Sequence, residues 1–465
     1  MAPLACLLQE QGHRVRGTDG PLYPPMSTLL AAAGIHPLEG YDPAHLEPRP
    51  DLVIVGNAIR RDNPEAVEAE RLGIPRLSMP EALSRFFLTG RRPLVVSGTH
   101  GKTTTTALAA WVYTACGRDP GYLIGGVPKN LPGSFHGGTG ERFIIEGDEY
   151  NAAFFDRGAK FLHYQPETLL WTSAEYDHAD LYPTPESLWE AYGKLLRLLP
   201  STGLLVACGD SPKVREIVQE AGRESGCRVL FYGLEEGNDL RPLGPIEALP
   251  DASRFRVHDE AAGEVEIELR IPGGHNVSNA LAVWAAARRD GIPAAEVADA
   301  LRRFEGVKRR IEELGTVRGV TVVDDFAHHP TAVEKTLIAL RQRYPGRRLV
   351  ALFEPRSLTA GRTFFFEPYL QAFTGADRVL FAPTFHAGRL TDDERLDFGE
   401  LAEKLDASGT PATLTSDPAE VLTKALGEAR EGDVLVTMSS GSFQGMPKRL
   451  VEGLGGVPAE TQPVS

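Results

Sequence analysis

Segments with strand character alternate with amphipathic stretches along most of the chain. The strand-like segments of the first two thirds are HRVRGTD, DLVIVGN, RFIIE, TLLWTS, LLVAC and RVLFY. Helical patterns lie between them, for example at 26–34 and 64–73. Strands that alternate with helices indicate parallel sheets, so the pattern predicts an α/β fold. We expect the first 90 residues to form a small doubly wound unit.

Two changes of pattern divide the chain. A polar junction, TGRRP at 89–93, precedes the apolar run LVVSG. The segment HNVSNALAVWAAARRDGIP predicts a helix with a Gly-Ile-Pro stop, and ALRRFEGVKRRIEEL then leads into the strand VTVVDDF. Beyond it, RLVALFE, RVLFAP and DVLVTMS predict another parallel unit. With 465 residues and about 150 residues per domain, we expect domains at 1–90, 91–310 and 311–465.

Composition excludes several classes of protein. The chain has no apolar run of about 18 residues, so we expect no membrane association. The net charge of −14 lacks the basic footprint of nucleic-acid binding. The four cysteines are scattered, which argues against a zinc site and a disulfide framework. The first residues lack the pattern of a secretory signal, so we expect a cytoplasmic protein.

A phosphate-binding loop is predicted after the run LVVSG, where a good helix follows a glycine-rich turn. The loop residues are Gly98, Thr99, His100, Gly101, Lys102, Thr103 and Thr104. In such a loop backbone amides cradle a polyphosphate, Lys102 reaches its outer oxygens and the Thr103 hydroxyl can ligate magnesium. The long motif is incomplete, since Val96 stands where the first glycine belongs. The alternative is an ordinary turn capped by threonines.

A second cluster of polar residues follows two other predicted strands. Glu146 ends RFIIE, and Glu175, Asp177, His178 and Asp180 follow TLLWTS. In a parallel sheet both sets would emerge beside the phosphate loop. Carboxylates near a polyphosphate suggest Mg²⁺. The alternative is a solvated acidic loop with a surface histidine.

Six ordered motifs resemble the Mur ligase superfamily: GTHGKTTTT, IIEGDEY, EYDHADLY, GGHNVSN, KRRIEE and VVDDFAHHP. Further stretches, among them YPPMSTLL, GNAIRRDNPE, DEYNAAFFDRGAKFLHYQP and MSSGSFQG, are most similar to the murein peptide ligases. The resemblance implies a Rossmann-like domain for a UDP-sugar, a central ATPase domain and a Rossmann-like domain for the incoming amine. It also implies an ATP- and Mg²⁺-dependent ligase that joins UDP-N-acetylmuramate to the tripeptide L-alanyl-γ-D-glutamyl-meso-diaminopimelate through an acyl phosphate.

Residue roles follow from the same resemblance. It assigns the phosphates and one magnesium to Lys102 and Thr103, and a second magnesium to Glu146 and His178. Adenine would contact His275, Asn276 and Asn279. Arg310 would reach the γ-phosphate, and Asp325 would meet the ribose. His328, His329 and Arg356 also fit family motifs and are expected contacts of the substrate or the migrating phosphate. The structural alternatives are a helix cap for Asn276, an ion pair with Glu313 for Arg310, and a turn for Asp325.

The sequence departs from the family pattern in two places. Relatives have a strand and a glycine-rich loop before the equivalent of MAPLACLL, so we expect either a true start upstream of Met1 or a weakened UDP-sugar floor, with Asp19 and the turn at Asn57 as remaining contacts. Several relatives carry a carbamylated lysine where this chain has Gly193, followed by Lys194, so no such modification is predicted.

Three other functions compete with this hypothesis. They are a UDP-N-acetylmuramate–L-alanine ligase, a non-catalytic binder of a UDP-sugar or nucleotide, and a simple kinase or ATPase. The last leaves the first and third domains without a purpose, and a mere binder needs no complete phosphate and magnesium apparatus. We expect a monomer or a weak homo-oligomer.

Overall fold

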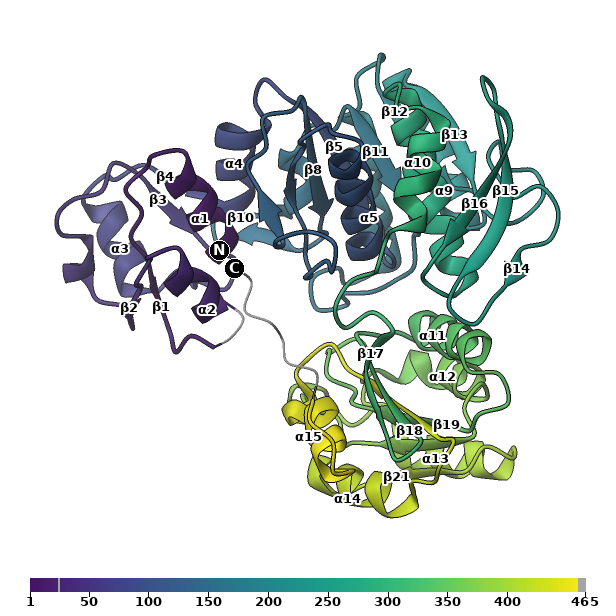
Figure 1. The fold of residues 1–465 in the computed structure, drawn as a ribbon. Coiled ribbons are helices and arrows are strands. Elements are labelled where there is room, and N and C mark those ends of the chain that lie inside the picture. Colours follow the sequence, from purple (N-terminus) through teal and green to yellow (C-terminus); the bar gives the residue numbers. More distant parts are fainter. Residues whose placement is uncertain (24–25, 459–465) are drawn as a thin grey trace.

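The computed structural model describes residues 1–23 and 26–458, and Figure 1 shows three groups of elements in chain order. The first group contains two separate parallel strand pairs, β1 (Thr18–Asp19) with β2 (Leu38–Glu39) and β3 (Val53–Val55) with β4 (Arg76–Ser78). Its helices are α1 (Ala2–Glu10), α2 (Met26–Ala32), α3 (Pro64–Arg71) and α4 (Met79–Leu83). The strand expected over HRVRGTD is thus much shorter than predicted, because most of that segment is polar and exposed.

The central group is built on a seven-stranded sheet in the order β13-β12-β11-β5-β8-β6-β7. Its strands are β5 (Arg92–Ser97), β6 (Gly121–Leu123), β7 (Phe135–His136), β8 (Arg142–Gly147), β11 (Thr168–Trp171), β12 (Leu204–Cys208) and β13 (Arg228–Tyr232). All neighbours pair in parallel except β6 and β7. Strands β11 and β8 flank β5, so the two polar segments emerge beside the loop after β5, as predicted.

Alternating side chains of this sheet enter two hydrophobic cores, because successive residues of a strand point to opposite faces. On β5, Leu94 and Val96 join the core under helices α5 and α9, while Val95 joins the core on the other face. The helices of the group are α5 (Lys102–Ala115), α6 (Pro185–Arg197), α7 (Pro212–Ile217), α8 (Arg223–Ser225), α9 (Gly274–Arg289) and α10 (Ala294–Arg302). Helix α9 has the extent predicted from its Gly-Ile-Pro stop.

Two antiparallel features of the central group were not predicted. One is a three-stranded sheet of β14 (Glu247–Ala248), β15 (Ser253–Asp259) and β16 (Gly263–Leu269), and the other is the pair β9 (Asn151–Ala153) and β10 (Asp156–Ala159). The burial of β15 alternates strictly, which is the signature of a sheet with one solvated face. The period-two pattern of SRFRVHD could therefore have revealed this sheet.

The last group has a six-stranded sheet in the order β17-β18-β22-β19-β20-β21. Its strands are β17 (Glu312–Val317), β18 (Val320–Asp325), β19 (Leu349–Phe353), β20 (Arg378–Phe381), β21 (Ala412–Leu414) and β22 (Val434–Met438). The predicted strands pair in parallel, while the unpredicted β17 is antiparallel to β18. The helices are α11 (Pro330–Arg343), α12 (Phe366–Phe373), α13 (Phe398–Ala407), α14 (Pro418–Glu428) and α15 (Met446–Gly453). Across the described chain, no helix combines the length and apolarity needed to span a bilayer.

Candidate functional site

The loop between β5 and α5 depends on two glycines. Gly98 has φ +130° and Gly101 has φ +80°, conformations that side chains rarely adopt. A Cβ on Gly98 would lie 2.7 Å from the backbone nitrogen of Ser173, and one on Gly101 would lie 2.9 Å from Oδ1 of Asn279. The loop thus packs tightly between the end of β11 and helix α9, and its amides stand at the N-terminus of α5, where anions bind.

The first charged group at this loop, the lysine cluster, comprises Lys102, Glu149 and His178. The ammonium of Lys102 lies 3.0 Å from both carboxylate oxygens of Glu149 and donates a hydrogen bond of 2.7 Å to the carbonyl of Gly98. Nε2 of His178 lies 3.0 Å from the same carboxylate, whose side chain is 1% exposed. Burial opposes ionisation of Glu149, yet Lys102 and His178 lower its pKa to about 2.

Glu149 is a functional candidate that the sequence analysis missed, although it lies within the quoted motif IIEGDEY. Burial lowers the pKa of Lys102, but Glu149 and two neighbouring carboxylates raise it overall. The pKa of His178 also rises despite burial, because Glu149 and Asp177 favour its charged form. One buried carboxylate therefore holds Lys102 and His178 in place and favours the charged form of each.

Glu146 occupies a different environment at the end of β8. Its carboxylate accepts hydrogen bonds of 2.9 Å from the Thr103 hydroxyl and from the backbone N–H of Gly125. The guanidinium of Arg310 approaches the same Thr103 hydroxyl at 3.4 Å. Burial and the charge of Asp148 raise the pKa of Glu146. A cation beside Glu146 would relieve this unfavourable burial of negative charge.

The predicted adenine and ribose contacts have structural partners of their own. Asn276 donates a hydrogen bond of 2.7 Å to the carbonyl of Pro272, and Asn279 donates one of 3.2 Å to Asn276. Asp325 accepts hydrogen bonds of 2.7 Å from the backbone N–H groups of Ile311 and Ala327. It therefore holds the linker before β17. The alternative of an ion pair between Arg310 and Glu313 is not seen, because Glu313 pairs with Arg343 instead.

A cavity of about 1500 Å³ unites most of the predicted residues. It is lined by Thr99, His100, Gly101, Lys102, Thr103, Thr104, Glu146, His178, His275, Asn276, Asn279, Arg310, Asp325 and His328. It also touches Met1 and Met26 of the first group and Lys335 of the last. Burial, with a smaller contribution from Lys335, lowers the pKa of His275 to about 3, so this ring is neutral inside the cavity.

Four predicted substrate contacts lie away from this lining. Asp19 and Asn57 are exposed, and the carboxylate of Asp19 accepts hydrogen bonds from the N–H of Gly20 and the Tyr41 hydroxyl. Arg356 lies over the ring of Phe385 at 3.9 Å. His329 is buried against the phosphate loop. Gly98, predicted as a nucleotide contact, is also absent from the lining and contributes its carbonyl to Lys102.

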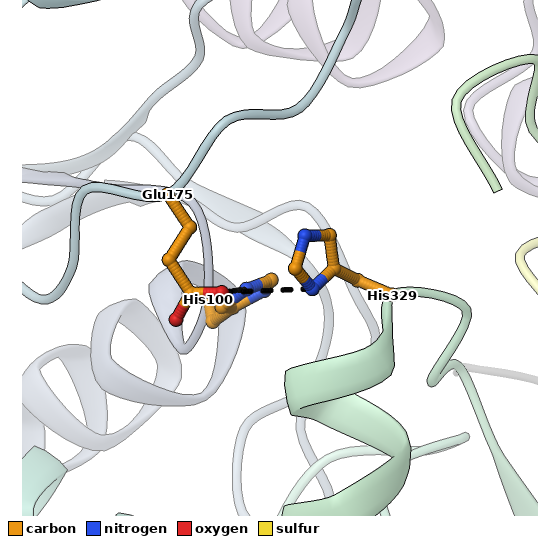
Figure 2. A group of neighbouring side chains, drawn as sticks. All are labelled: His100, Glu175 and His329. Atoms are coloured by element: carbon orange, nitrogen blue, oxygen red, sulfur yellow. Dashed lines mark hydrogen bonds and ion pairs between the residues drawn. The ribbon is translucent and has the colours of Figure 1, made fainter. Parts of the chain in front are cut away.

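The second charged group, the histidine cluster, comprises His100, Glu175 and His329 (Figure 2). Nε2 of His100 lies 3.3 Å and Nδ1 of His329 lies 3.6 Å from one carboxylate oxygen of Glu175. The hydroxyl of Thr331 donates to the same oxygen at 2.5 Å. Since His329 and Thr331 begin helix α11, this cluster joins the central sheet to the last one.

The fold and the site define a multidomain α/β protein with a phosphate-binding loop at a shared cavity. Family comparison matches residues 1–91 to "Mur ligase family, catalytic domain", 96–287 to "Mur ligase middle domain" and 309–441 to "Mur ligase, glutamate ligase domain". The chain belongs to the Mur ligase family.

Similar proteins span nearly the whole chain. The UDP-N-acetylmuramate–L-alanyl-γ-D-glutamyl-meso-2,6-diaminoheptandioate ligase of Escherichia coli K12 is 37% identical over 98% of this chain and 96% of its own length. A UDP-N-acetylmuramate–L-alanine ligase of Arthrobacter sp. FB24 is 36% identical over 82% of this chain and 78% of its own. The crystal structure of a murein peptide ligase from Psychrobacter arcticus matches with TM-score 0.72 and 34% identity, covering 99% and 97% of the two chains.

Proposed function

We propose that this chain is an ATP- and Mg²⁺-dependent ligase that joins UDP-N-acetylmuramate to L-alanyl-γ-D-glutamyl-meso-diaminopimelate. The observation that carries the proposal is the single cavity at which Lys102, Glu146, His178 and Arg310 converge. The substrates are those in the names of two relatives that are 37% and 34% identical over 98% of this chain. The proposed domains keep the boundaries 1–90, 91–310 and 311–465, with the linker at Arg310 between the last two.

The donor set at Glu146 fits a magnesium ion. Mg²⁺ prefers carboxylate, hydroxyl, water and phosphate oxygens. Glu146 and Thr103 offer two such oxygens 2.9 Å apart, and His178 lines the same cavity. The buried charge of Glu146 and its neighbour Asp148 favours a cation here. Bound there, magnesium would supply charge neutralisation for the transferring phosphate.

The residues then act mainly by positioning. Lys102 and the amides of the loop bind the polyphosphate, and Arg310 stabilises charge that develops on the γ-phosphate. The muramate carboxylate attacks that phosphorus, the bond to ADP breaks, and an acyl phosphate forms. The tripeptide amine attacks the acyl carbon, loses a proton and displaces inorganic phosphate. His275, Asn276, Asn279 and Asp325 would contact the nucleoside, and His328 faces the reacting groups from the last domain.

The amine accepted is the decisive test, because L-alanine ligases are similar to this chain at nearly the same identity. The protein is incubated with ATP, Mg²⁺ and UDP-N-acetylmuramate plus either L-alanine or the tripeptide. Mass spectrometry should detect the UDP-muramyl tripeptide and no UDP-muramyl-alanine. The alanine product alone would assign the chain to the other activity. If no product formed with either amine, the ligase proposal would be overturned.

A further inference from the structure

A lysine outside the predicted site lies on the wall of the large cavity. Lys160 follows directly after strand β10, the second strand of the antiparallel pair that the sequence analysis did not predict. Its side chain lines the cavity and is 16% exposed. The proposed function assigns this lysine no role.

The hairpin of β9 and β10 returns the chain to the segment that follows β8. The backbone N–H of Lys160 donates a hydrogen bond of 2.9 Å to the carbonyl of Tyr150. The turn of the hairpin packs against the first group, where the guanidinium of Arg76 lies 4.7 Å from the centre of the Phe155 ring. These contacts hold the lysine at a cavity wall to which Met79 of the first group also contributes.

Two contacts position the ammonium group and leave it able to bind an anion. Nζ of Lys160 lies 3.3 Å from Oδ2 of Asp148 and 5.6 Å from the centre of the Tyr150 ring. That ring lies 4.3 Å from the ring of His178, so the ammonium and the lysine cluster occupy neighbouring parts of one wall. Asp148 is the only hydrogen-bond acceptor of Nζ among the described residues, which leaves two of its three donors for a ligand.

The charge of the surrounding wall explains why a cation is needed there. Glu146 and Asp148 both line the cavity, and the charge of Asp148 contributes to the raised pKa of Glu146. These carboxylates would repel an anionic substrate, since like charges interact strongly where water is scarce. In the proposed function Lys102 and Arg310 serve the phosphates of ATP. Lys160 is a cation on this wall that remains for a second anion.

We propose that Lys160 binds an anionic group of the UDP-sugar and so helps to select the acid substrate. Two groups of that molecule share this chemistry, the lactyl carboxylate of the muramate and the diphosphate. A hydrogen bond from an ammonium to either oxyanion is charge-assisted and roughly twice as strong as one between neutral groups. The inference rests on the proposed function, because it takes UDP-N-acetylmuramate as the substrate. It adds a residue that was not among the predicted substrate contacts.

The test measures binding by calorimetry on the full chain, with Mg²⁺ and a non-hydrolysable ATP analogue present so that no turnover occurs. Lys160→Met keeps a side chain of similar length and removes its charge. The affinity for UDP-N-acetylmuramate should fall about 10–100-fold, which corresponds to the loss of one hydrogen bond to a charged group. Lys160→Arg keeps the charge and should recover most of the affinity.

UDP-N-acetylglucosamine, which lacks the lactyl carboxylate, identifies the group that Lys160 binds. If the carboxylate is the partner, Lys160→Met should bind this sugar as tightly as the wild type does. If the diphosphate is the partner, both sugars should lose affinity equally. The matched control is Lys213→Met, because Lys213 also pairs with a carboxylate, Glu216 at 2.6 Å, and lies 5.7 Å from the centre of the Trp189 ring, but does not line the cavity. Its affinities should be those of the wild type.

Steady-state kinetics separates binding from a merely structural role. Lys160→Met should raise the Michaelis constant for the UDP-sugar and leave those for ATP and the tripeptide near the wild-type values. Equal rises in all three constants, with a lower melting temperature, would overturn the inference. So would unchanged affinity of Lys160→Met for both sugars, even in a protein whose wild type makes the tripeptide product. A wild type that binds no UDP-N-acetylmuramate would instead overturn the proposed function, and this inference with it.

Discussion

Two charged clusters share one loop but differ in origin. The lysine cluster is drawn entirely from the central sheet and its connections, and its charged groups are all paired. The histidine cluster spans two sheets, and Nε2 of His329 is buried there with no hydrogen-bond partner among the described residues. The first is therefore set by the central sheet alone. The second forms only when helix α11 lies against the central sheet, so it depends on the contact between the last two domains.

The largest expected effect is on the lysine cluster. Lys102→Ala removes a charge-assisted contact that strengthens as charge develops in the transition state, so ligase turnover should fall on the order of 10²–10³-fold. Steady-state rates of product formation measure this. Lys194→Ala, which removes an exposed lysine paired with Glu190 at 2.9 Å, should keep the wild-type rate. Wild-type activity in Lys102→Ala would refute the phosphate-loop assignment.

Glu149→Gln should have the next largest effect, because it keeps the side-chain volume but removes the charge that holds Lys102 and His178. We expect a loss of about 10–100-fold in apparent Mg²⁺ affinity or rate, as for other groups that orient metal ligands. Rates measured against Mg²⁺ concentration would show the shift, with the Michaelis constant for the UDP-sugar unchanged. Glu190→Gln on the exposed face of α6 is the matched control. An unaltered dependence of the rate on Mg²⁺ concentration would show that Glu149 does not position the magnesium-binding groups.

The contributions of the two clusters to the free energy of unfolding should change in different pH ranges. The folded pKa of His329 is about 3, below its ordinary 6.5, so below pH 6.5 the unfolded chain takes up a proton that the folded protein does not, and stability falls as the pH falls from 6.5 toward 3. Glu149 has a folded pKa of about 2 against 4.5, so its contribution is lost only below pH 4.5. Each group changes the free energy of unfolding by up to about 1.4 kcal/mol per pH unit.

Melting temperatures of the wild type and His329→Gln across pH 4–7 separate these effects. The wild type should lose stability relative to the variant as soon as the pH falls below about 6.5. Parallel curves for the two proteins over this range would show that His329 is not held in its neutral buried form.

The smallest effect concerns docking itself. Thr331→Val removes the hydroxyl that donates to Glu175, and a hydrogen bond to a charged group contributes about 1.5–3 kcal/mol. The nucleotide-free variant should show a larger radius of gyration in small-angle scattering, and an ATP analogue should compact it more than the wild type. Thr423→Val, on the exposed surface of α14, serves as the control. Equal radii for both proteins would separate this contact from domain closure.

Much of the fold and part of the site could be predicted from sequence. The strand, glycine loop and helix around Lys102 are local features, and the parallel strands and helix α9 follow from hydrophobic period and stop signals. The resemblance to the Mur ligase family located the residues of the cavity. The antiparallel strands β14 to β16 were not predicted, because they contain no continuous apolar run and β15 instead alternates buried and more exposed residues.

The pairing of side chains was decided only by the tertiary structure. Lys102 meets Glu149 across 47 residues and Glu175 meets Thr331 across 156 residues. Sequence determines that a lysine begins the helix after one strand and that a carboxylate follows another strand, but strand order determines which carboxylate reaches the lysine. Those choices depend on the burial of two complete cores and on contacts between sheets, which are sums over many distant residues. A local sequence pattern does not contain these long-range contributions. For this reason His329 could be predicted as a substrate contact and yet lie buried against His100.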